Sequence, residues 1–345
     1  MLWVGYYRNG KQYLESARSA RKDDAVNLLK RREGDVARGL PVTAKMGQLR
    51  FEEARDDLLN YQRANQRPIK KLEARIANHL TPYFGRRRMA DITAAHVWSY
   101  IAQRQEAKAS NATINRELTI LKRMFSLAIR ASKLLQKPSI EMLKENNVRT
   151  GFFEREQYTT VLAHLPEALR PVITFAYYTG WRITSEVLPL EWHQVDLATG
   201  MVRLNPGTTK NGEGRVFYLT PELRTLIEER QRATDNLKAR GVIVPWVFFR
   251  MVAKGRRGPK SPKRITAFGK AWKTACRKAG CPGRIPHDLR RTAVRNMVRV
   301  GIPERVAMQL TGHKTRSVFD RYNIVSEGDR VDAARRLSGR PAVGQ

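Results

Sequence analysis

The sequence contains few cysteines and no long apolar run. Its two cysteines, Cys276 and Cys281, allow at most one disulfide and cannot by themselves make a zinc site with four cysteine ligands. We therefore expect two reduced thiols in or near a helix. No metal and no cofactor are expected for this chain. No apolar segment is long enough to cross a membrane, and no signal-peptide pattern follows Met1. These absences favour an intracellular protein.

Acidic residues are also scarce relative to basic ones. The 345 residues include 32 Asp and Glu against 65 Lys and Arg, which gives a net charge of +33 and a pI near 10.8. A solvated surface rich in lysine usually carries matching acids, whereas an excess of this size indicates a polyanionic partner, most commonly nucleic acid. The imbalance is greatest from Arg250 to Arg299, where 16 basic residues accompany one acid, Asp288.

Residues 1–44 have the pattern of a small separate module. An aromatic run from Trp3 to Tyr13 is broken by Asn9-Gly10, which is typical of a β-hairpin. A helical stretch follows and is expected to end in basic residues at Arg32. A hairpin and one helix are barely stable alone, so we predict an accessory module, whose first strand could be incomplete at Met1.

Residues 45–146 show apolar residues at helical spacing throughout. The clearest stripe runs from Ile114 to Ile129 and has a basic opposite face. A plain helix bundle with a basic exterior explains this pattern, so any function of this part depends on its charge and position. The stretch from Lys137 to Asn147 is the expected linker.

Residues 151–338 mix two periodicities and are followed by a tail, residues 339–345. Helical segments precede and follow an alternating pair, Met201–Asn205 and Arg215–Leu219, which predicts an antiparallel hairpin. The segment Gly255–Pro262 is expected to be a basic loop. The order of helices, one small hairpin and more helices predicts an α+β fold with a small antiparallel sheet.

Six residues of this third part have the chemistry needed to hold a phosphate and attack it. Phosphodiester transfer needs an aligned nucleophile and positive donors around the non-bridging oxygens. Arginine is the best such donor, because its planar fork meets two oxygens and keeps its proton. The six candidates are Arg182, Lys210, His287, Arg290, His313 and Tyr322.

The local sequence suggests how helix ends could present four of them. Arg182 follows a Thr-Gly break and is expected at the start of a helix, where free backbone N–H groups favour an anion. His287 and Arg290 share one face if their helix begins at Pro286 or just after. Gly312 fits the left-handed end of a helix starting at Pro303, which would present His313. In that helix, Val306, Ala307 and Leu310 are expected to face inward.

The nucleophile and the acid are assigned by context. Tyr322 lies nine residues after His313 in a polar setting. A free tyrosine has a pKa of about 10, so nearby cations must activate it as it attacks. Lys210 is expected at the tip of the predicted hairpin, where a mobile lysine could protonate a departing oxygen.

Each residue also has a simpler interpretation. Arg182 could be a surface residue paired with Glu186 one turn on, and Lys210 could be an ordinary exposed turn residue. A histidine that opens a helix is more often a surface residue than a catalyst. It is the order and spacing of the whole set that favour catalysis.

These segments resemble the tyrosine recombinase (phage integrase) family. The resemblance is strong over residues 151–338. Residues 113–118 are similar to the core-binding domain of that family, and the N-terminal hairpin resembles its arm-type DNA-binding module. The matching segments are Thr179-Gly180-Trp181-Arg182, Lys210, His287-Asp288-Leu289-Arg290, Leu310-Thr311-Gly312-His313 and Tyr322.

The resemblance implies three domains, an arm-type module at 1–44, an all-helical core-binding domain at 45–146 and a mostly helical catalytic domain at 151–338. Tyr322 would form a 3′-phosphotyrosine, with the arginines holding the phosphate, the histidines assisting and Lys210 as general acid. No ATP and no metal would be needed. Four subunits would assemble on double-stranded DNA at two attachment sites, with the segment after Tyr322 docking on a neighbour. The protein would be found in the cytoplasm of a prokaryotic cell, associated with the nucleoid. Accessory DNA-bending or directionality proteins would be further partners.

One departure from the family pattern affects Arg182. The family usually has an acid three residues after this arginine, whereas here Glu186 comes four residues after it. We interpret this as a one-residue insertion. Two alternatives to an integrase of a phage or mobile element remain: a type IB topoisomerase, which shares the tyrosine chemistry, and an architectural DNA-binding protein without enzymatic activity.

Overall fold

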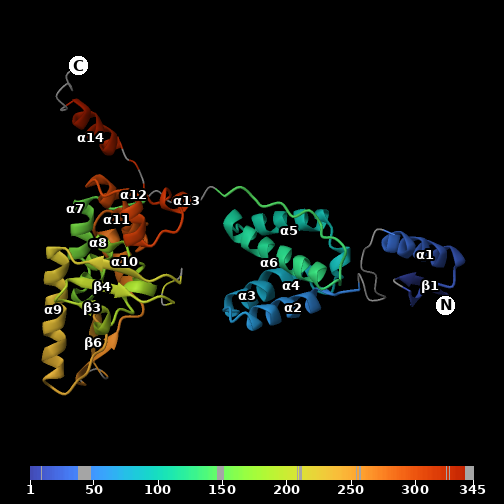
Figure 1. Cartoon of the computed structure of the whole chain (residues 1–345), viewed down its shortest axis with the longest axis horizontal. Helices are drawn as coiled ribbons and strands as arrows, with labels where there is room; N and C mark the ends of the chain where they lie inside the picture. Colours follow the sequence, from blue (N-terminus) through green and yellow to red (C-terminus); the bar gives the residue numbers. More distant parts are fainter. Residues whose placement is uncertain are drawn as a thin grey trace. The chain divides into compact units, whose positions relative to one another are not determined.

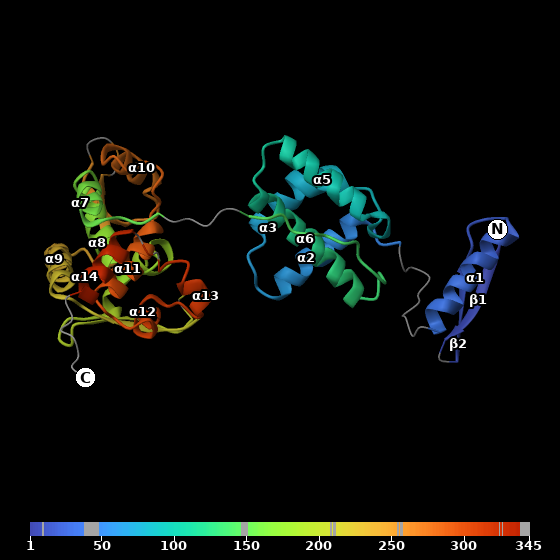
Figure 2. The same ribbon diagram turned by 90° about the horizontal axis from the view of Figure 1, so that it is seen from above.

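The computed structural model describes residues 1–8, 10–37, 48–145, 151–207, 209, 212–253, 255, 258–323, 325 and 327–338. The chain divides into two compact units, Met1–Asn147 and Val148–Gln345. In the described residues helices predominate, and the strands form three small antiparallel sheets (Figures 1 and 2). This is the predicted α+β class. None of the described helices is both long and apolar enough to cross a membrane.

The first unit begins with a hairpin and a helix and continues with helices alone. Its elements are β1 (Trp3–Arg8), β2 (Lys11–Ser16), α1 (Lys22–Ala37), α2 (Phe51–Ala64), α3 (Lys70–Arg75), the π-turn η1 (Ile76–Leu80), α4 (Thr81–Phe84), the 3₁₀ turn η2 (Met89–Asp91), α5 (Ala94–Glu106) and α6 (Asn111–Arg130).

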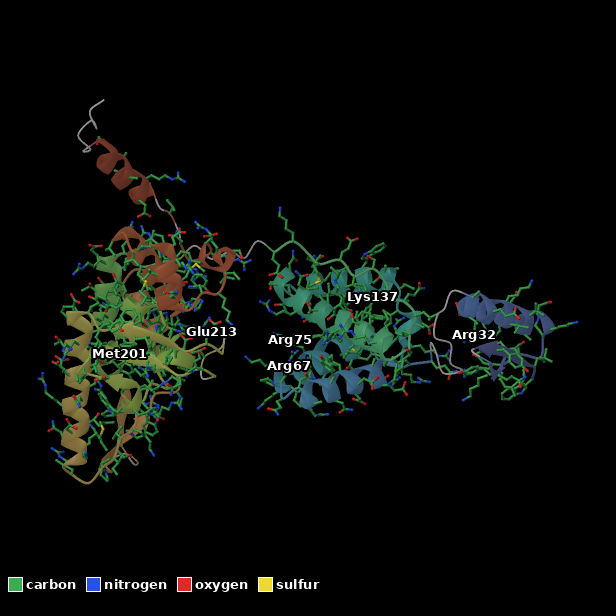
Figure 3. All side chains as sticks on the ribbon, in the orientation of Figure 1. Arg32, Arg67, Arg75, Lys137, Met201 and Glu213 are labelled. Atoms are coloured by element: carbon green, nitrogen blue, oxygen red, sulfur yellow. The ribbon has the colours of Figure 1, made fainter. Side chains whose placement is uncertain are left out.

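The predicted N-terminal hairpin is present, but the helix that follows it ends later than predicted. Strands β1 and β2 pair from Trp3 opposite Ser16 to Arg8 opposite Lys11, with Gly10 in the turn at a φ of 74°. Asn9 lies outside the described residues. Helix α1 continues five residues past Arg32, the predicted end. Arg32, which is labelled in Figure 3, is buried, and its Nε donates to Glu15 on β2 at 2.8 Å. The ion pair between Arg32 and Glu15 therefore links α1 to the hairpin.

The helical part of the first unit packs as its periodicity predicts. Ile114, Leu118, Leu121 and Phe125 of α6 are buried in a core shared with α2, η1, α4 and α5. In the middle of this core, the buried carboxylate of Glu117 accepts hydrogen bonds from the side chains of Tyr100 and Arg104, at 2.8 and 3.0 Å. Glu117 therefore links α5 to α6 inside the core.

Part of the expected linker belongs to this helical core. The side-chain oxygen of Asn115 accepts from the backbone nitrogen of Leu143, and its amide donates back to the Leu143 carbonyl, each at 2.8 Å. Ile140 is buried. Residues 146–147, which complete the expected linker, lie outside the described residues.

The second unit contains the remaining elements. They are α7 (Arg155–Ala163), the 3₁₀ turn η3 (Glu167–Leu169), α8 (Arg170–Thr179), the π-turn η4 (Ile183–Val187), the 3₁₀ turn η5 (Trp192–Gln194), β3 (Val195–Asp196), β4 (Met201–Leu204), β5 (Arg215–Tyr218), α9 (Pro221–Lys238), β6 (Phe249–Ala253), β7 (Lys260–Arg264), α10 (Gly269–Lys278), α11 (Asp288–Arg299), α12 (Glu304–Thr311), α13 (Arg316–Phe319) and α14 (Glu327–Ser338).

The core of this unit surrounds helices α8 and α11. Val172, Ile173 and Ala176 of α8 pack with Leu289 and Val294 of α11, and the sheet β3-β4-β5 adds Val202 and Phe217. The predicted hairpin is thus present, with β3 as a short third strand. The C-terminus of α8 lies beside the first turns of α11, so residues at these two helix ends come close together.

Two expectations for this unit were wrong. The segment expected as a basic loop, Gly255–Pro262, is partly strand, because β7 begins at Lys260 and pairs with β6 in a second ribbon. In α12, Val306 is 42% exposed rather than inward, whereas Ala307 is fully buried. An eight-residue helix that packs on one side buries only a narrow stripe of side chains, and Val306 lies outside that stripe.

Candidate active site

Arg182 follows helix α8, which ends at a glycine in the left-handed conformation. Gly180 closes α8 with a φ of 65°, and a Cβ at this position would lie 3.0 Å from both Ala293 and Thr311. Glycine therefore allows α8 to pack closely against α11 and α12. The next residue, Trp181, is buried, and its ring nitrogen donates to the Leu310 carbonyl at 3.0 Å. The anchored tryptophan fixes the position from which Arg182 extends.

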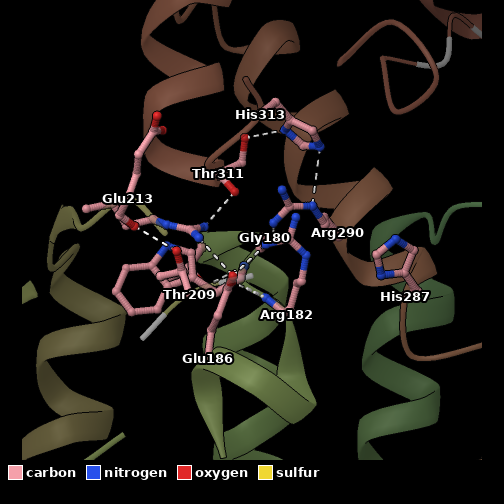
Figure 4. Close-up of polar contacts among 12 residues, drawn as sticks. Gly180, Arg182, Glu186, Thr209, Glu213, His287, Arg290, Thr311 and His313 are labelled. Atoms are coloured by element: carbon pink, nitrogen blue, oxygen red, sulfur yellow. Dashed lines mark hydrogen bonds and ion pairs between the residues drawn. The ribbon is translucent and has the colours of Figure 1, made fainter. Parts of the chain in front are cut away.

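The extra residue after Arg182 is absorbed by a π-turn. Leu188 donates its backbone N–H to the carbonyl of Ile183, five residues earlier, at 2.8 Å. A π-turn contains one residue more than an α-turn while the helix on either side keeps its direction. Glu186 is thereby turned back onto Arg182. Its carboxylate accepts from the Arg182 backbone nitrogen at 2.7 Å and from Nη1 at 2.6 Å (Figure 4).

Arg290 reaches the same place from the first turn of α11. Its side chain is almost completely buried, with Nη1 donating to the Gly180 carbonyl at 2.7 Å. Nε donates to the ring of His313 at 3.3 Å. Its second terminal nitrogen, Nη2, is buried and has no hydrogen-bond partner among the described residues. A buried guanidinium N–H without a partner is costly, and an anion bound here would satisfy it.

His313 is presented by the end of α12, as predicted. Gly312 adopts the left-handed conformation with a φ of 72°. Nδ1 of His313 lies 2.7 Å from the hydroxyl of Thr311, which itself donates to the Ala307 carbonyl at 2.6 Å. Because that hydroxyl proton is already used, Nδ1 carries a proton and donates. Nε2 then accepts from Arg290.

Tyr322 and His287 form a direct hydrogen bond. The phenol oxygen lies 2.8 Å from Nε2 of His287, the residue immediately before α11. The tyrosine ring lies 4.6 Å from the His313 ring, centre to centre, and the Arg290 guanidinium lies 5.7 Å from the tyrosine ring centre. Five of the six candidates therefore occupy one site. The sixth, Lys210, lies outside the described residues.

Both histidines are neutral in this setting. Burial, and then the charge of Arg290, lowers the pKa of His287 to about 4. The same two causes lower the pKa of His313 to about 3. Neutral imidazole can accept a proton, so His287 can receive the phenol proton from Tyr322. A phosphate entering among these cations would favour the protonated histidines and raise both pKa values.

Arg215 belongs to the site and was missed as a candidate. Its Nη2 donates to Glu186 at 2.8 Å and its Nη1 to the Thr311 carbonyl at 2.7 Å. The guanidinium packs so close to Gly312 that a Cβ there would lie 2.5 Å from it. A signal was present in the sequence, because Arg215 and Phe217 occupy alternate positions of one strand and both point inward.

The site opens into a cleft of about 360 Å³. Arg182, His287 and Arg290 line it together with Trp181 and Pro286. Two guanidinium groups therefore line one space together with a neutral imidazole, and that imidazole is hydrogen-bonded to the phenol of Tyr322. Among the described residues, no cluster of histidine, cysteine and acidic side chains could hold a metal ion. The chemistry favoured by these groups is attack by a phenol on a phosphate diester held by arginines.

Comparisons with known proteins identify the family of this chain. Residues 152–328 match the profile described as the phage integrase family. The integrase of Salmonella phage P22 is 26% identical over 234 residues, which is 66% of this chain and 58% of that protein. The tyrosine recombinase XerC of Lactobacillus leichmannii is 26% identical over 229 residues, which is 64% of this chain and 74% of that protein. The chain thus spans less than two thirds of the P22 integrase.

Two solved structures share the fold. A lambda integrase dimer bound to a COC′ core site has a TM-score of 0.63 at 15% identity, covering 99% of this chain and 95% of that one. The Tn1549 transposon integrase in complex with a circular intermediate DNA has a TM-score of 0.62 at 14% identity, covering 82% of this chain and 99% of that one.

Proposed function

The chain belongs to the phage integrase family, and on that premise we propose that it is a site-specific DNA recombinase that cuts and rejoins strands through Tyr322. The observation that carries the proposal is the 2.8 Å contact between the phenol of Tyr322 and a neutral His287, at the edge of a cleft lined by Arg182 and Arg290. The substrate is double-stranded DNA at two attachment sites, and the outcome is integration or excision of a phage or mobile element.

In the proposed cleavage step, the Tyr322 oxygen attacks the scissile phosphorus and its proton passes to His287 Nε2. The bond from phosphorus to the 5′ oxygen breaks, leaving a 3′-phosphotyrosine. The departing oxygen takes a proton from Lys210 and becomes a 5′-hydroxyl. Rejoining reverses these transfers with a 5′-hydroxyl from the partner strand. Each step exchanges one phosphate ester for another, so no ATP is needed.

The arginines supply the electrostatic stabilisation. Arg182 and Arg290 hold the non-bridging oxygens, where negative charge builds in the transition state, and the unpaired Nη2 of Arg290 offers a donor that needs no reorganisation. One preorganised donor of this kind is worth about 10²–10³ in rate. Glu186 fixes Arg182, so the guanidinium is already oriented before DNA binds.

The remaining assignments extend the same proposal. Residues 1–44 act as an arm-type DNA-binding module, 45–146 as a core-binding domain and 151–338 as the catalytic domain. Four subunits assemble on two DNA sites in the nucleoid. The segment after Tyr322 docks on a neighbouring subunit. In the single chain, Asp329 of α14 pairs with the buried Arg295 and with Arg299, and the α14 of a neighbour would make the same two ion pairs in the assembly.

A nicked suicide substrate tests the chemistry. The duplex is built from the ends of the element that carries the gene, with a nick next to the cleavage point so that the released strand diffuses away. We expect a protein–DNA adduct that survives denaturation and is absent in Tyr322→Phe, while Tyr322→Phe still binds the duplex. Equal adduct from the variant would refute the role of Tyr322. Absence of any adduct from the parent, with binding intact, would favour an architectural protein, and relaxation of plasmid lacking a target site would favour a topoisomerase.

A further inference from the structure

The ribbon formed by β6 and β7 carries an unbalanced charge. Residues 249–264 contain seven Lys and Arg and no acid. Of the described cations, Arg250, Lys260, Lys263 and Arg264 are all exposed, and none forms an ion pair with a described acid. The next acid along the chain, Asp288, is fully buried and paired with Arg291, so it cannot offset this charge.

The strand register makes the charges oppose each other. Arg250 lies directly opposite Lys263 across the ribbon. Directly opposed side chains have Cβ atoms about 4.5–5.5 Å apart, and like charges in that position destabilise a sheet. A two-stranded ribbon has little stability to spare. Only Phe249 at its base is buried, so the other positions contribute little packing. The sequence of this ribbon therefore weakens its own fold.

We propose that the β6–β7 ribbon is a DNA-binding element that contacts the phosphates of duplex DNA outside the catalytic site. A phosphate placed between Arg250 and Lys263 converts their repulsion into two attractive contacts. A two-stranded ribbon also has the width of the DNA major groove, whose rims are lined by phosphates. Figure 1 places β6 at the end of the unit away from α12. This inference rests on the proposed function. It adds a DNA contact outside the cleavage site.

Helix α9 provides a matched comparison within the same unit. It is also exposed and has basic residues, including Arg232 and Lys238, but it intersperses them with Glu222, Glu229 and Asp235. Mixed charge of this kind is usual for a solvated face. Removing two positive charges from α9 changes the net charge as much as removing two from the ribbon, but removes no proposed phosphate contact.

Salt-dependent binding separates the two cases. Each protein is the full chain in the Tyr322→Phe background, and its affinity for a labelled mixed-sequence duplex is measured by anisotropy over a range of KCl concentrations. We expect Arg250→Gln/Lys263→Gln to reduce the slope of log K against log salt by about 0.9, the value for one lost phosphate. Arg232→Gln/Lys238→Gln should leave the slope unchanged, as should the charge-preserving Arg250→Lys/Lys263→Arg.

Thermal unfolding without DNA provides the second measurement. Because the opposed charges repel, Arg250→Gln/Lys263→Gln should melt no lower than its parent. An unchanged slope for this variant, an equal loss in the α9 variant, or a lower melting temperature would each overturn the proposal. These outcomes are independent of strand cleavage, since adduct formation by the protein with Tyr322 intact tests the recombinase function separately.

Discussion

Glu186 holds Arg182 by two bonds at once, accepting from its backbone nitrogen at 2.7 Å and from its Nη1 at 2.6 Å. Glu186 is the fourth residue after Arg182, where the family pattern has the acid at the third, and the π-turn that begins at Ile183 accounts for the difference. The carboxylate is fully buried, so its charge is matched by Arg182 and Arg215 rather than by water. The insertion therefore leaves the arginine oriented.

Deleting Ser185 should leave the site intact. Ser185 is exposed within the π-turn, and its removal converts each bond spanning five residues into an α-helical bond spanning four. We expect unchanged adduct formation and a melting temperature equal to or above that of the parent. The measurements are single-turnover adduct formation on the suicide substrate and thermal unfolding.

The control for this deletion is an insertion. One alanine added between Thr184 and Ser185 cannot be absorbed by a turn that already holds an extra residue, and it rotates Glu186 about 100° around the helix axis away from Arg182. We expect adduct formation to fall by about 10² or more, as for a misplaced catalytic group. If deletion and insertion are equally harmful, the π-turn is not the element that accommodates the extra residue.

Neutralising Glu186 should slow cleavage more than it weakens DNA binding. Glu186→Gln keeps the shape of the side chain but places an amide next to one of two arginines that each need an acceptor. Arg182 then loses its fixed orientation, and we expect a single-turnover rate lower by about 10². Affinity for duplex DNA should change little, because Glu186→Gln leaves the proposed phosphate contacts of the β6–β7 ribbon intact. Glu228→Gln, which breaks an exposed pair with Arg224, is the matched control; an equal loss of rate there would refute the assignment.

Local signals in the sequence located most of this site. Arg182 and His313 lie beside glycines that end helices, and His287 and Arg290 lie in the first turn of another, so short motifs were enough to place them. Arg215 was missed because its partners, Glu186 and Thr311, are far away in the chain. The π-turn was also beyond prediction, since only the finished packing shows where Glu186 must point.

The same distinction applies to the fold. Helices were predictable wherever a continuous apolar stripe existed, as in α6. The sequence predicts a loop rather than the start of β7 at Gly255–Pro262, because this segment shows no alternation of apolar and polar side chains. The end of α1 was misplaced because Arg32 looks like a terminating charge but is buried against Glu15. In both cases long-range contacts decide the outcome.

Arg215 should contribute to stability as well as to the site. Arg215→Met removes a buried cation that donates to both Glu186 and the Thr311 carbonyl. Breaking a buried ion pair by removing one partner costs about 3–5 kcal/mol, whereas an exposed pair contributes about 0–1 kcal/mol. We expect urea unfolding to show the larger loss for Arg215→Met and the smaller one for Arg224→Met, whose pair with Glu228 is exposed. Equal losses would mean that Arg215 is not an essential support of this network.

Stability should fall with acid because two histidines are buried in the neutral form. The pKa of His287 is lowered to about 4 and that of His313 to about 3, whereas an unfolded histidine has a pKa of about 6.5. Between those values the unfolded chain binds more protons than the folded one. The stabilisation is therefore complete above about pH 6.5 and is lost as pH falls toward the folded pKa values.

The two histidines can be separated from other acid-sensitive groups by substitution. His287→Gln and His313→Gln should each flatten the decline in urea-unfolding free energy between pH 7 and pH 4, and the double variant should flatten it most. His193→Gln, at a position where the side chain is 63% exposed, should leave the decline unchanged. Because a bound phosphate raises both pKa values, DNA binding near pH 5 should also take up protons, and these variants should reduce that uptake. An acid decline as steep in the double variant as in the parent would show that the neutral histidines are not its cause.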